Sequence, residues 1–252
     1  MRKLIKFEFR KLLRSRYFYI ILGVSLLLVI LNGLITNLLA SMAQELGQEV
    51  AMDAYSFAKS TLSSTFMLLV GIFVAIYACE DFSHGILKNV VGKGYAREKV
   101  LYSKYLVSLL GALFIALVSV LFGFLFGNIL WGNKATSDNV AVIIIGQFVG
   151  LITYHALFFA IAYTIRKPGF AIAINVVAPT VLSLVFTLVD TGLQNAKIDF
   201  NITQFWVERL HTEFISVSGD SSIYGRNIAI LLVYFAAAIL IGFFANRKRE
   251  IK

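Results

Sequence analysis

Charge is scarce in this chain for its length. Only 15% of the 252 residues are charged, whereas 59% are hydrophobic and the mean hydropathy is +0.81. A soluble domain of this size needs far more charged surface. The composition therefore excludes a soluble protein and predicts an integral membrane protein.

The sequence also lacks the residues of common catalytic and metal sites. Cys79 is the only cysteine, so neither a disulfide nor a cysteine metal site is available. A P-loop needs Gly-x-x-x-x-Gly-Lys-Ser/Thr, and the nearest segment, Gly92-Lys93-Gly94, has neither that spacing nor the hydroxyl. Neither His-Glu-x-x-His nor Gly-x-Ser-x-Gly occurs. We therefore expect that this chain is not an enzyme and that it has no catalytic residue, no metal site and no cofactor.

What the chain does have is six long apolar runs. Each is long enough to cross a hydrocarbon core of about 30 Å as a helix of about 20 residues. They predict an all-α membrane protein with a single transmembrane domain over residues 1–252. The expected spans are Tyr17–Leu39, Thr61–Cys79, Tyr105–Leu130, Val140–Ile165, Ala171–Val189 and Asn227–Ala245.

The distribution of Lys and Arg predicts the orientation. If the N-terminus is inside, 18 of the 23 basic residues lie in inner segments, and the reverse orientation would place those 18 outside. The positive-inside rule favours the first arrangement. We expect both termini and residues 80–104 to be cytoplasmic, with the protein in the plasma membrane. The net charge of +9 then reflects orientation and anionic lipid, not nucleic acid.

Two segments outside the spans have helical patterns. Residues 1–16 form a basic amphipathic segment, with Ile5, Phe9 and Leu12 on one helical face, and we expect an interfacial helix there. The acidic segment 40–60 is expected to be an outer loop. Residues 190–226 form the longest outer segment, which we expect to contain a short amphipathic helix around Trp206.

His155 is the one histidine in the middle of an expected span, with Gln147 two turns earlier. A titratable group in a membrane is costly, so the pair is a candidate polar site. A histidine without a mid-span carboxylate makes a poor proton relay. A neutral His155 that hydrogen-bonds a neighbouring helix is the favoured interpretation.

Residues 80–104 have two interpretations. Phe82, Ile86 and Leu87 supply apolar side chains for a short helix that Gly92 and Gly94 would end. Such a helix, held between two spans, can transmit the motion of a soluble partner. The alternative is an ordinary basic loop of a protein with its N-terminus inside, and composition alone favours that interpretation.

This segment resembles the one that follows the second span in type-2 ABC transporter permeases. The resemblance consists of Glu80-x4-Gly85, a short helix, and Arg97 and Lys104 leading into the third span, although this chain has Gly94-Tyr95-Ala96 where the family often has a proline. Residues 4–12 are similar to the connecting helix of that family. The resemblance implies a coupling helix that docks on an ATPase subunit. The implied coupling residues are Glu80, Asp81, Phe82, Gly85, Ile86, Leu87, Lys88, Arg97 and Lys104.

The resemblance also implies partners. The chain would work by alternating access with two ABC ATPase subunits, which bind ATP and Mg²⁺, and with a second permease, itself or a paralogue. Its cargo would be amphipathic or lipophilic, as in export systems for antimicrobial or toxin peptides. Two alternatives are an ion-coupled secondary transporter that uses His155, and an immunity or sensor protein that sequesters a peptide through residues 190–226 without ATP.

Overall fold

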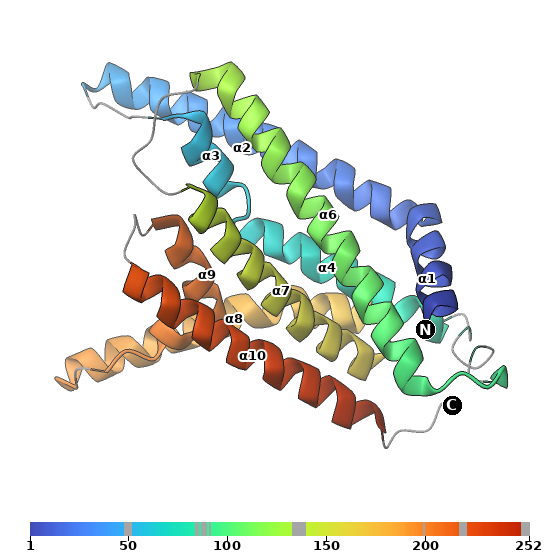
Figure 1. The fold of residues 1–252 in the computed structure, drawn as a ribbon. Helices are drawn as coiled ribbons and strands as arrows, with labels where there is room; N and C mark the ends of the chain where they lie inside the picture. The colour runs from blue at the N-terminus through green and yellow to red at the C-terminus, as the bar shows by residue number, and fades with distance from the viewer. Residues whose placement is uncertain are drawn as a thin grey trace.

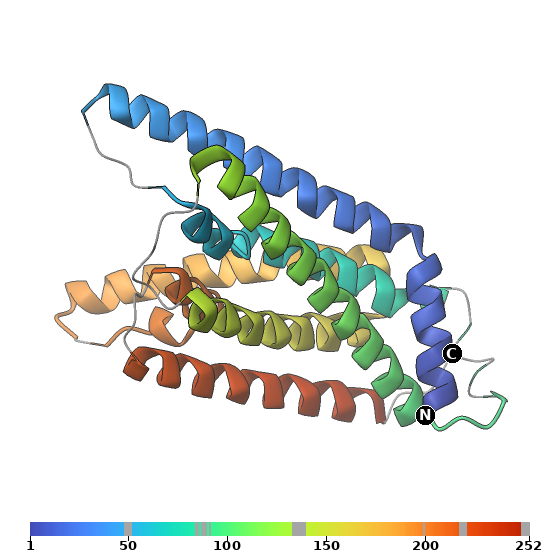
Figure 2. The ribbon, with the colours of Figure 1, turned by 45° about the horizontal axis from the view of Figure 1, so that its top comes forward.

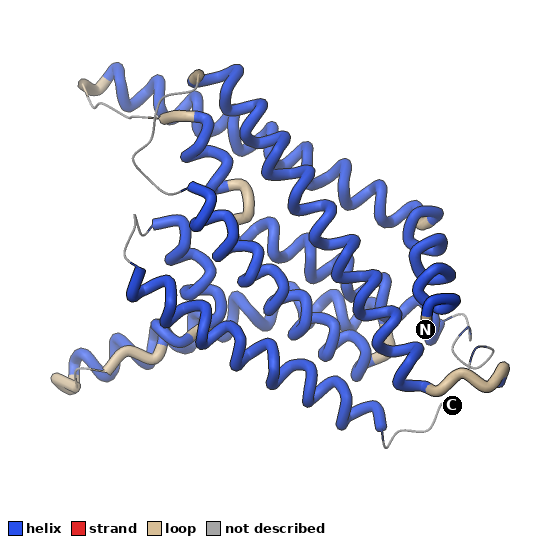
Figure 3. Tube along the Cα trace, in the orientation of Figure 1, coloured by secondary structure: helices blue, strands red, loops and turns tan. Residues whose placement is uncertain are grey.

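The chain folds into helices joined by short connections (Figures 1 and 3). The computed structural model describes residues 1–47, 52–83, 86, 90, 92–132, 140–198, 200–216 and 221–247, and no strand occurs among them. The helices are α1 (Arg2–Arg14), α2 (Arg16–Glu45), α3 (Ala54–Ser60), α4 (Ser64–Ser83), α6 (Arg97–Trp131), α7 (Val140–Ile165), α8 (Pro168–Asn195), the 3₁₀ turn η1 (Thr203–Phe205), α9 (Val207–Ser216) and α10 (Ser221–Arg247).

Six of these helices are long and apolar enough to cross a membrane, and they confirm the six predicted spans. They are α2, α4, α6, α7, α8 and α10. Several are longer than expected: α6 begins at Arg97, before the expected start at Tyr105, and runs for 35 residues. At about 1.5 Å per residue, α6 is roughly 50 Å long, so it extends beyond a hydrocarbon core of about 30 Å.

The long helices run side by side, and α1 crosses one end of the bundle (Figures 1 and 2). That end also contains the last turn of α4 and the first turns of α6, and we call it the charged end. The short helices α3 and α9 lie at the opposite end, which we call the far end (Figure 1).

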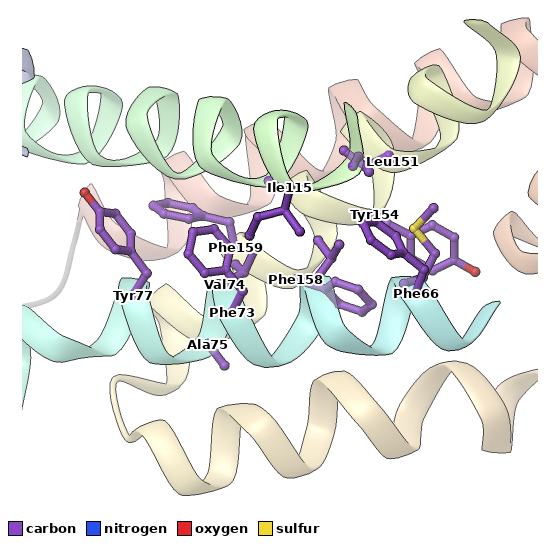
Figure 4. Close-up of a cluster of buried hydrophobic side chains, with 14 of the residues drawn as sticks. Phe66, Phe73, Val74, Ala75, Tyr77, Ile115, Leu151, Tyr154, Phe158 and Phe159 are labelled. Carbon is purple, nitrogen blue, oxygen red and sulfur yellow. The ribbon is translucent and has the colours of Figure 1, made fainter. Parts of the chain in front are cut away.

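The core of the bundle lies between α4, α6 and α7. Phe73 of α4, Ile115 of α6 and Phe158 of α7 belong to this cluster, together with Tyr154 and Phe159 of α7 (Figure 4). The extent of burial separates the central from the peripheral helices, because 61% of the α4 span is buried but only 6% of the α8 span. A lipid-facing apolar surface carries no penalty in a membrane, which is why α8 remains so exposed.

The structure corrects two expectations from the sequence. The segment 40–60 is not only a loop, because α3 forms at its end and the Asp53 carboxylate caps it by accepting a hydrogen bond from Ser56 N at 2.9 Å. In α1, Leu12 does not share a face with Phe9. Leu12 is buried with Leu4 and Glu8, whereas Phe9 is exposed.

The short amphipathic helix expected in residues 190–226 is present as α9. It begins at Val207, so Trp206 lies just before it. Val207, Leu210 and Phe214 form its buried face. The helix α9 packs on α7, where glycines allow close approach.

Hydrogen bonds from buried side chains to backbone carbonyls stabilise the far end. Gln147 Nε2 of α7 donates to Lys59 O at the end of α3, at 2.7 Å. His211 Nε2 of α9 lies 2.6 Å from Leu62 O in the turn between α3 and α4. A carbonyl only accepts, so His211 Nε2 carries the proton and donates this hydrogen bond. Burial lowers the pKa of His211 to about 4.

Substitution of the α7 glycines tests the packing of α9. A Cβ at Gly150 would lie 2.4 Å from His211 Nδ1, and one at Gly146 would lie 2.6 Å from Phe214 Cδ1. We expect Gly150→Ala and Gly146→Ala each to destabilise the protein by about 1–3 kcal/mol, because buried rings have to move. Thermal unfolding in detergent measures the effect.

Gly23→Ala is the matched control, since nothing lies within 4 Å of a Cβ there. It removes a glycine from a helix and is expected to leave Tm unchanged or slightly raised. Equal Tm values for all three variants and the wild type would contradict the close α7–α9 contact.

The depressed pKa of His211 predicts a pH dependence of stability. The unfolded chain binds a proton at this residue below pH 6.5, but the folded chain binds one only near pH 4. The contribution of His211 to the free energy of unfolding is therefore fully present above pH 6.5. It decreases as the pH falls to 4, by about 3 kcal/mol at most. We expect Tm to fall more between pH 7.5 and 4.5 in the wild type than in His211→Gln, which keeps a donor for Leu62 O. Equal falls in the two proteins would refute this role.

Candidate functional site: a charge cluster at the charged end

The last turn of α4 places two carboxylates at the charged end of the bundle. Glu80 is partly exposed, but the Asp81 side chain is only 3% exposed. Asp81 accepts from two lysines at once, from Lys11 of α1 and from Lys104 of α6, the latter at 2.5 Å. Lys11 Nζ also lies 2.9 Å from Glu80. One buried carboxylate thus joins three helices.

Lys104 depends on this carboxylate. Its side chain is 1% exposed, and its Nζ forms an ion pair with Asp81 and lies 5.5 Å from the centre of the Tyr77 ring. A buried ammonium without a counter-charge costs several kcal/mol. Asp81 therefore compensates the burial of Lys104, while the Tyr77 ring adds a weaker cation–π contact.

The helix α1 contributes a second pair of charged residues, Glu8 and Lys11. Glu8 Oε2 accepts a hydrogen bond from Tyr77 OH at 2.8 Å, and Lys11 lies one turn further along the same helix. Burial raises the pKa of Glu8. Burial alone would lower the pKa of Lys11, but the Asp81 and Glu80 carboxylates outweigh it and the pKa is raised. Lys11 is therefore held as a cation.

Apolar packing holds α1 in this position. Leu12 lies against Gly111 of α6, where a Cβ would come within 3.1 Å of its side chain. Leu4 packs with Val100 of α6, and Val90 and Tyr95 from the segment between α4 and α6 contact this pair. The helix α1 therefore takes part in the charge cluster and also contacts the segment 80–104, which was expected to couple to an ATPase subunit.

The structure brings together three of the predicted coupling residues, Glu80, Asp81 and Lys104, in one cluster. Phe82 lies nearby, with its ring on Tyr163 of α7 at 4.9 Å between centroids. Arg97 begins α6, and Ile86 is half-buried. The remaining three, Gly85, Leu87 and Lys88, lie outside the described residues.

Sequence reasoning missed Glu8, Lys11 and Tyr77. One signal was available for Glu8, because it is the only acidic residue among the first 16, which contain seven basic ones. An isolated acid in a basic helix indicates a specific partner. Lys11 carried no such signal, since it is one of many similar basic residues.

The two residues of the candidate polar site make separate contacts. His155 of α7 shares a hydrogen bond with Ser108 Oγ of α6 at 2.7 Å. This confirms the expectation that it bonds a neighbouring helix. Gln147 instead bonds the backbone at the end of α3. The structure therefore places His155 between α6 and α7, and Gln147 at the far end.

The charge cluster can transmit force between helices. It links α1 to α4 and α4 to α6 through short, buried, charge-assisted contacts, which hold one geometry better than exposed pairs do. A displacement of α1 therefore acts on the ends of two long helices.

Together, six apolar helices and a charged end define a multi-pass membrane protein. A family model described as "ABC-2 family transporter protein" matches residues 4–190, about three quarters of the chain. The chain therefore belongs to the ABC-2 family of transporter proteins. Members are membrane permease components, not catalytic themselves, and the family in general implies an ABC ATPase partner. No curated protein and no solved structure matches the chain significantly.

Removal of the shared carboxylate tests the cluster. Asp81→Asn leaves Lys104 buried without its counter-charge, which typically costs about 3–5 kcal/mol. We expect a marked fall in Tm and in the yield of folded protein. Glu80→Gln is the control, because Glu80 is 25% exposed and Lys11 keeps its ion pair with Asp81. The loss of folding free energy should therefore stay within about 1 kcal/mol.

Lys104→Met combined with Asp81→Leu completes this experiment. The pair removes both buried charges, and apolar replacements of that kind are often neutral for stability. Recovery of Tm relative to Asp81→Asn is expected. If Asp81→Asn and Glu80→Gln unfold at the same temperature, Asp81 does not have the central role described here.

Proposed function

We propose that this chain is the membrane subunit of an ATP-driven ABC exporter in the plasma membrane. Its charged end, with both termini, faces the cytoplasm, as the positive-inside rule favours for 18 of its 23 basic residues. Two separate ATPase subunits bind ATP and Mg²⁺ and dock at this end. The family membership supports a permease role, and the charge cluster supports the place of coupling.

The single observation that carries the proposal is the position of Asp81 between Lys11 and Lys104. The segment from Glu80 to Lys104 is the expected docking site of the ATPase, and its first and last residues are both held in the cluster. Closure of the ATPase pair would move this segment. The motion then reaches α1, α4 and α6 together, because Asp81 connects them.

A second permease copy or a paralogue completes the transporter in this proposal. The helix α8 is packed on one side only, and Val177, Val181 and Leu184 on it are at least half exposed. Its exposed side has apolar surface for lipid or for a partner helix. The cargo is an amphipathic or lipophilic molecule, with antimicrobial peptides as the expected class.

Co-purification from the native host tests the partner. We expect a P-loop ATPase to remain bound to the tagged chain in mild detergent, in a fixed ratio. An active transporter that retains no ATPase would contradict the proposal and favour the ion-coupled or peptide-sequestering alternatives.

A variant of α1 tests the coupling in the purified complex. Leu46 follows α2 at the far end and is 82% exposed, so a fluorophore on Leu46→Cys reports on motion there. Cys79 is buried and does not compete for the label. We expect ATP to change its emission in the wild type but not in Lys11→Met, which removes the α1–α4 ion pairs and leaves the Asp81–Lys104 pair in place.

Lys6→Met is the matched control, because Lys6 lies on the exposed face of the same helix. It is expected to keep the ATP response. An unchanged response in Lys11→Met, with the ATPase still bound, would show that force does not pass through the cluster.

A further inference from the structure

The short helix α3 separates α2 from α4 at the far end. It lies between α2 and α7 in both views of the fold (Figures 1 and 2). Its position is fixed on α6, because a Cβ at Gly127 would lie 3.1 Å from Ala54 Cα and one at Gly123 would lie 2.4 Å from Thr61 Oγ1. Gln147 and His211 hold its end and the following turn.

A cavity of about 400 Å³ opens between α2 and α4 beneath α3. This size lies within the range of small-molecule sites. Its apolar wall includes Phe57 and Phe66 together with leucine and isoleucine side chains. Its polar side chains are Ser25, Asn32, Ser60, Thr61, Ser63 and Thr65.

The cavity lies at the depth of the hydrocarbon core. Ser25 and Asn32 follow Arg16, the first residue of α2, by roughly 14 and 24 Å along the helix, at about 1.5 Å per residue. Both positions fall within a core of about 30 Å. The cavity therefore opens toward lipid tails and not only toward water.

Several hydroxyl groups in the cavity can form further hydrogen bonds. Ser60 Oγ and Thr61 Oγ1 donate to Phe57 O, at 2.8 and 3.2 Å, so their lone pairs are available as acceptors. Ser63 and Thr65 form no side-chain hydrogen bond to a described residue. Hydroxyl groups without a partner are costly in hydrocarbon. The wall therefore favours an occupant that forms hydrogen bonds.

The cavity wall also restricts the charge of that occupant. Every lining residue is neutral, being Ser, Thr, Asn, Leu, Ile, Val or Phe. A charged head group would lose water here without gaining a counter-charge. The wall thus combines hydroxyl and amide groups for a neutral polar head with an apolar surface for a chain.

We propose that this cavity binds the uncharged, hydrogen-bonding head of an amphipathic molecule whose apolar chain extends between α2 and α4 into the membrane. Binding at this cavity does not depend on the proposed transport function. Only the role of the ligand as cargo rests on that function. The same chemistry also describes a resident neutral lipid. The experiments below distinguish the two sources.

Fluorescence quenching in phosphatidylcholine nanodiscs tests binding by the permease alone. The Trp131 ring lies 5.3 Å from that of Phe57 in the cavity wall, so Trp131 is the reporter in a Trp206→Phe background. The probe is a monoacylglycerol with a dibrominated chain. We expect saturable quenching that unbrominated monoacylglycerol reverses. Lysophosphatidylglycerol with the same brominated chain, which differs by its anionic head, should quench at least ten-fold more weakly.

Two variants locate the site. Thr65→Phe fills the mouth of the cavity and should abolish saturable quenching. Ser63→Ala combined with Thr65→Val removes two hydroxyls at nearly constant volume and should weaken binding several-fold. Thr187→Val on α8 is the control, since this exposed hydroxyl only bonds its own helix and its loss should change nothing. Equal quenching by the neutral and anionic probes, or unchanged quenching in Thr65→Phe, would overturn the proposal.

The complex with its ATPase then identifies the source of the ligand. If monoacylglycerol stimulates ATP hydrolysis in the wild type but not in Thr65→Phe, the cavity is a cargo site. Saturable binding without stimulation identifies a resident lipid. Because the quenching experiment contains no ATPase, its result is independent of whether the proposed coupling is correct.

Discussion

The structure depends on one buried carboxylate. Asp81 lies where α1, α4 and α6 meet, and it compensates two lysines, one of them almost fully buried. A buried ion pair of this kind adds little net stability, but removing one partner costs several kcal/mol. Its effect is therefore to fix a single arrangement of three helices. That property suits a site where force enters a membrane protein.

The opposite end is held by different interactions. Neutral side chains, Gln147 and His211, donate to backbone carbonyls, and glycines of α6 and α7 allow α3 and α9 to pack closely. In a membrane, such close packing and interhelical hydrogen bonds replace the hydrophobic effect as the cause of helix association. The two ends thus differ in chemistry, because a buried carboxylate shared by two lysines joins the helices at one end, whereas buried neutral side chains bonded to backbone carbonyls join them at the other.

Most of the architecture was predictable because membrane spans are encoded locally. Apolar runs of sufficient length identified all six spans, and a mid-span histidine indicated an interhelical bond, which Ser108 provides. Lys11 and Tyr77 were not predictable, because their roles depend on α1 folding back over α4. The helix α3 was missed although its cap, Asp53, was visible, since seven residues give too little periodicity to distinguish a helix from a loop.

The helix α4 connects the two ends. Its first turn contains Thr65 and Phe66 of the cavity wall, and its last turn contains Asp81. Twenty residues of α-helix span about 30 Å, and the continuous backbone hydrogen bonds make such a segment move as one body. In the proposed mechanism, a shift of the charge cluster therefore changes the space between α2 and α4.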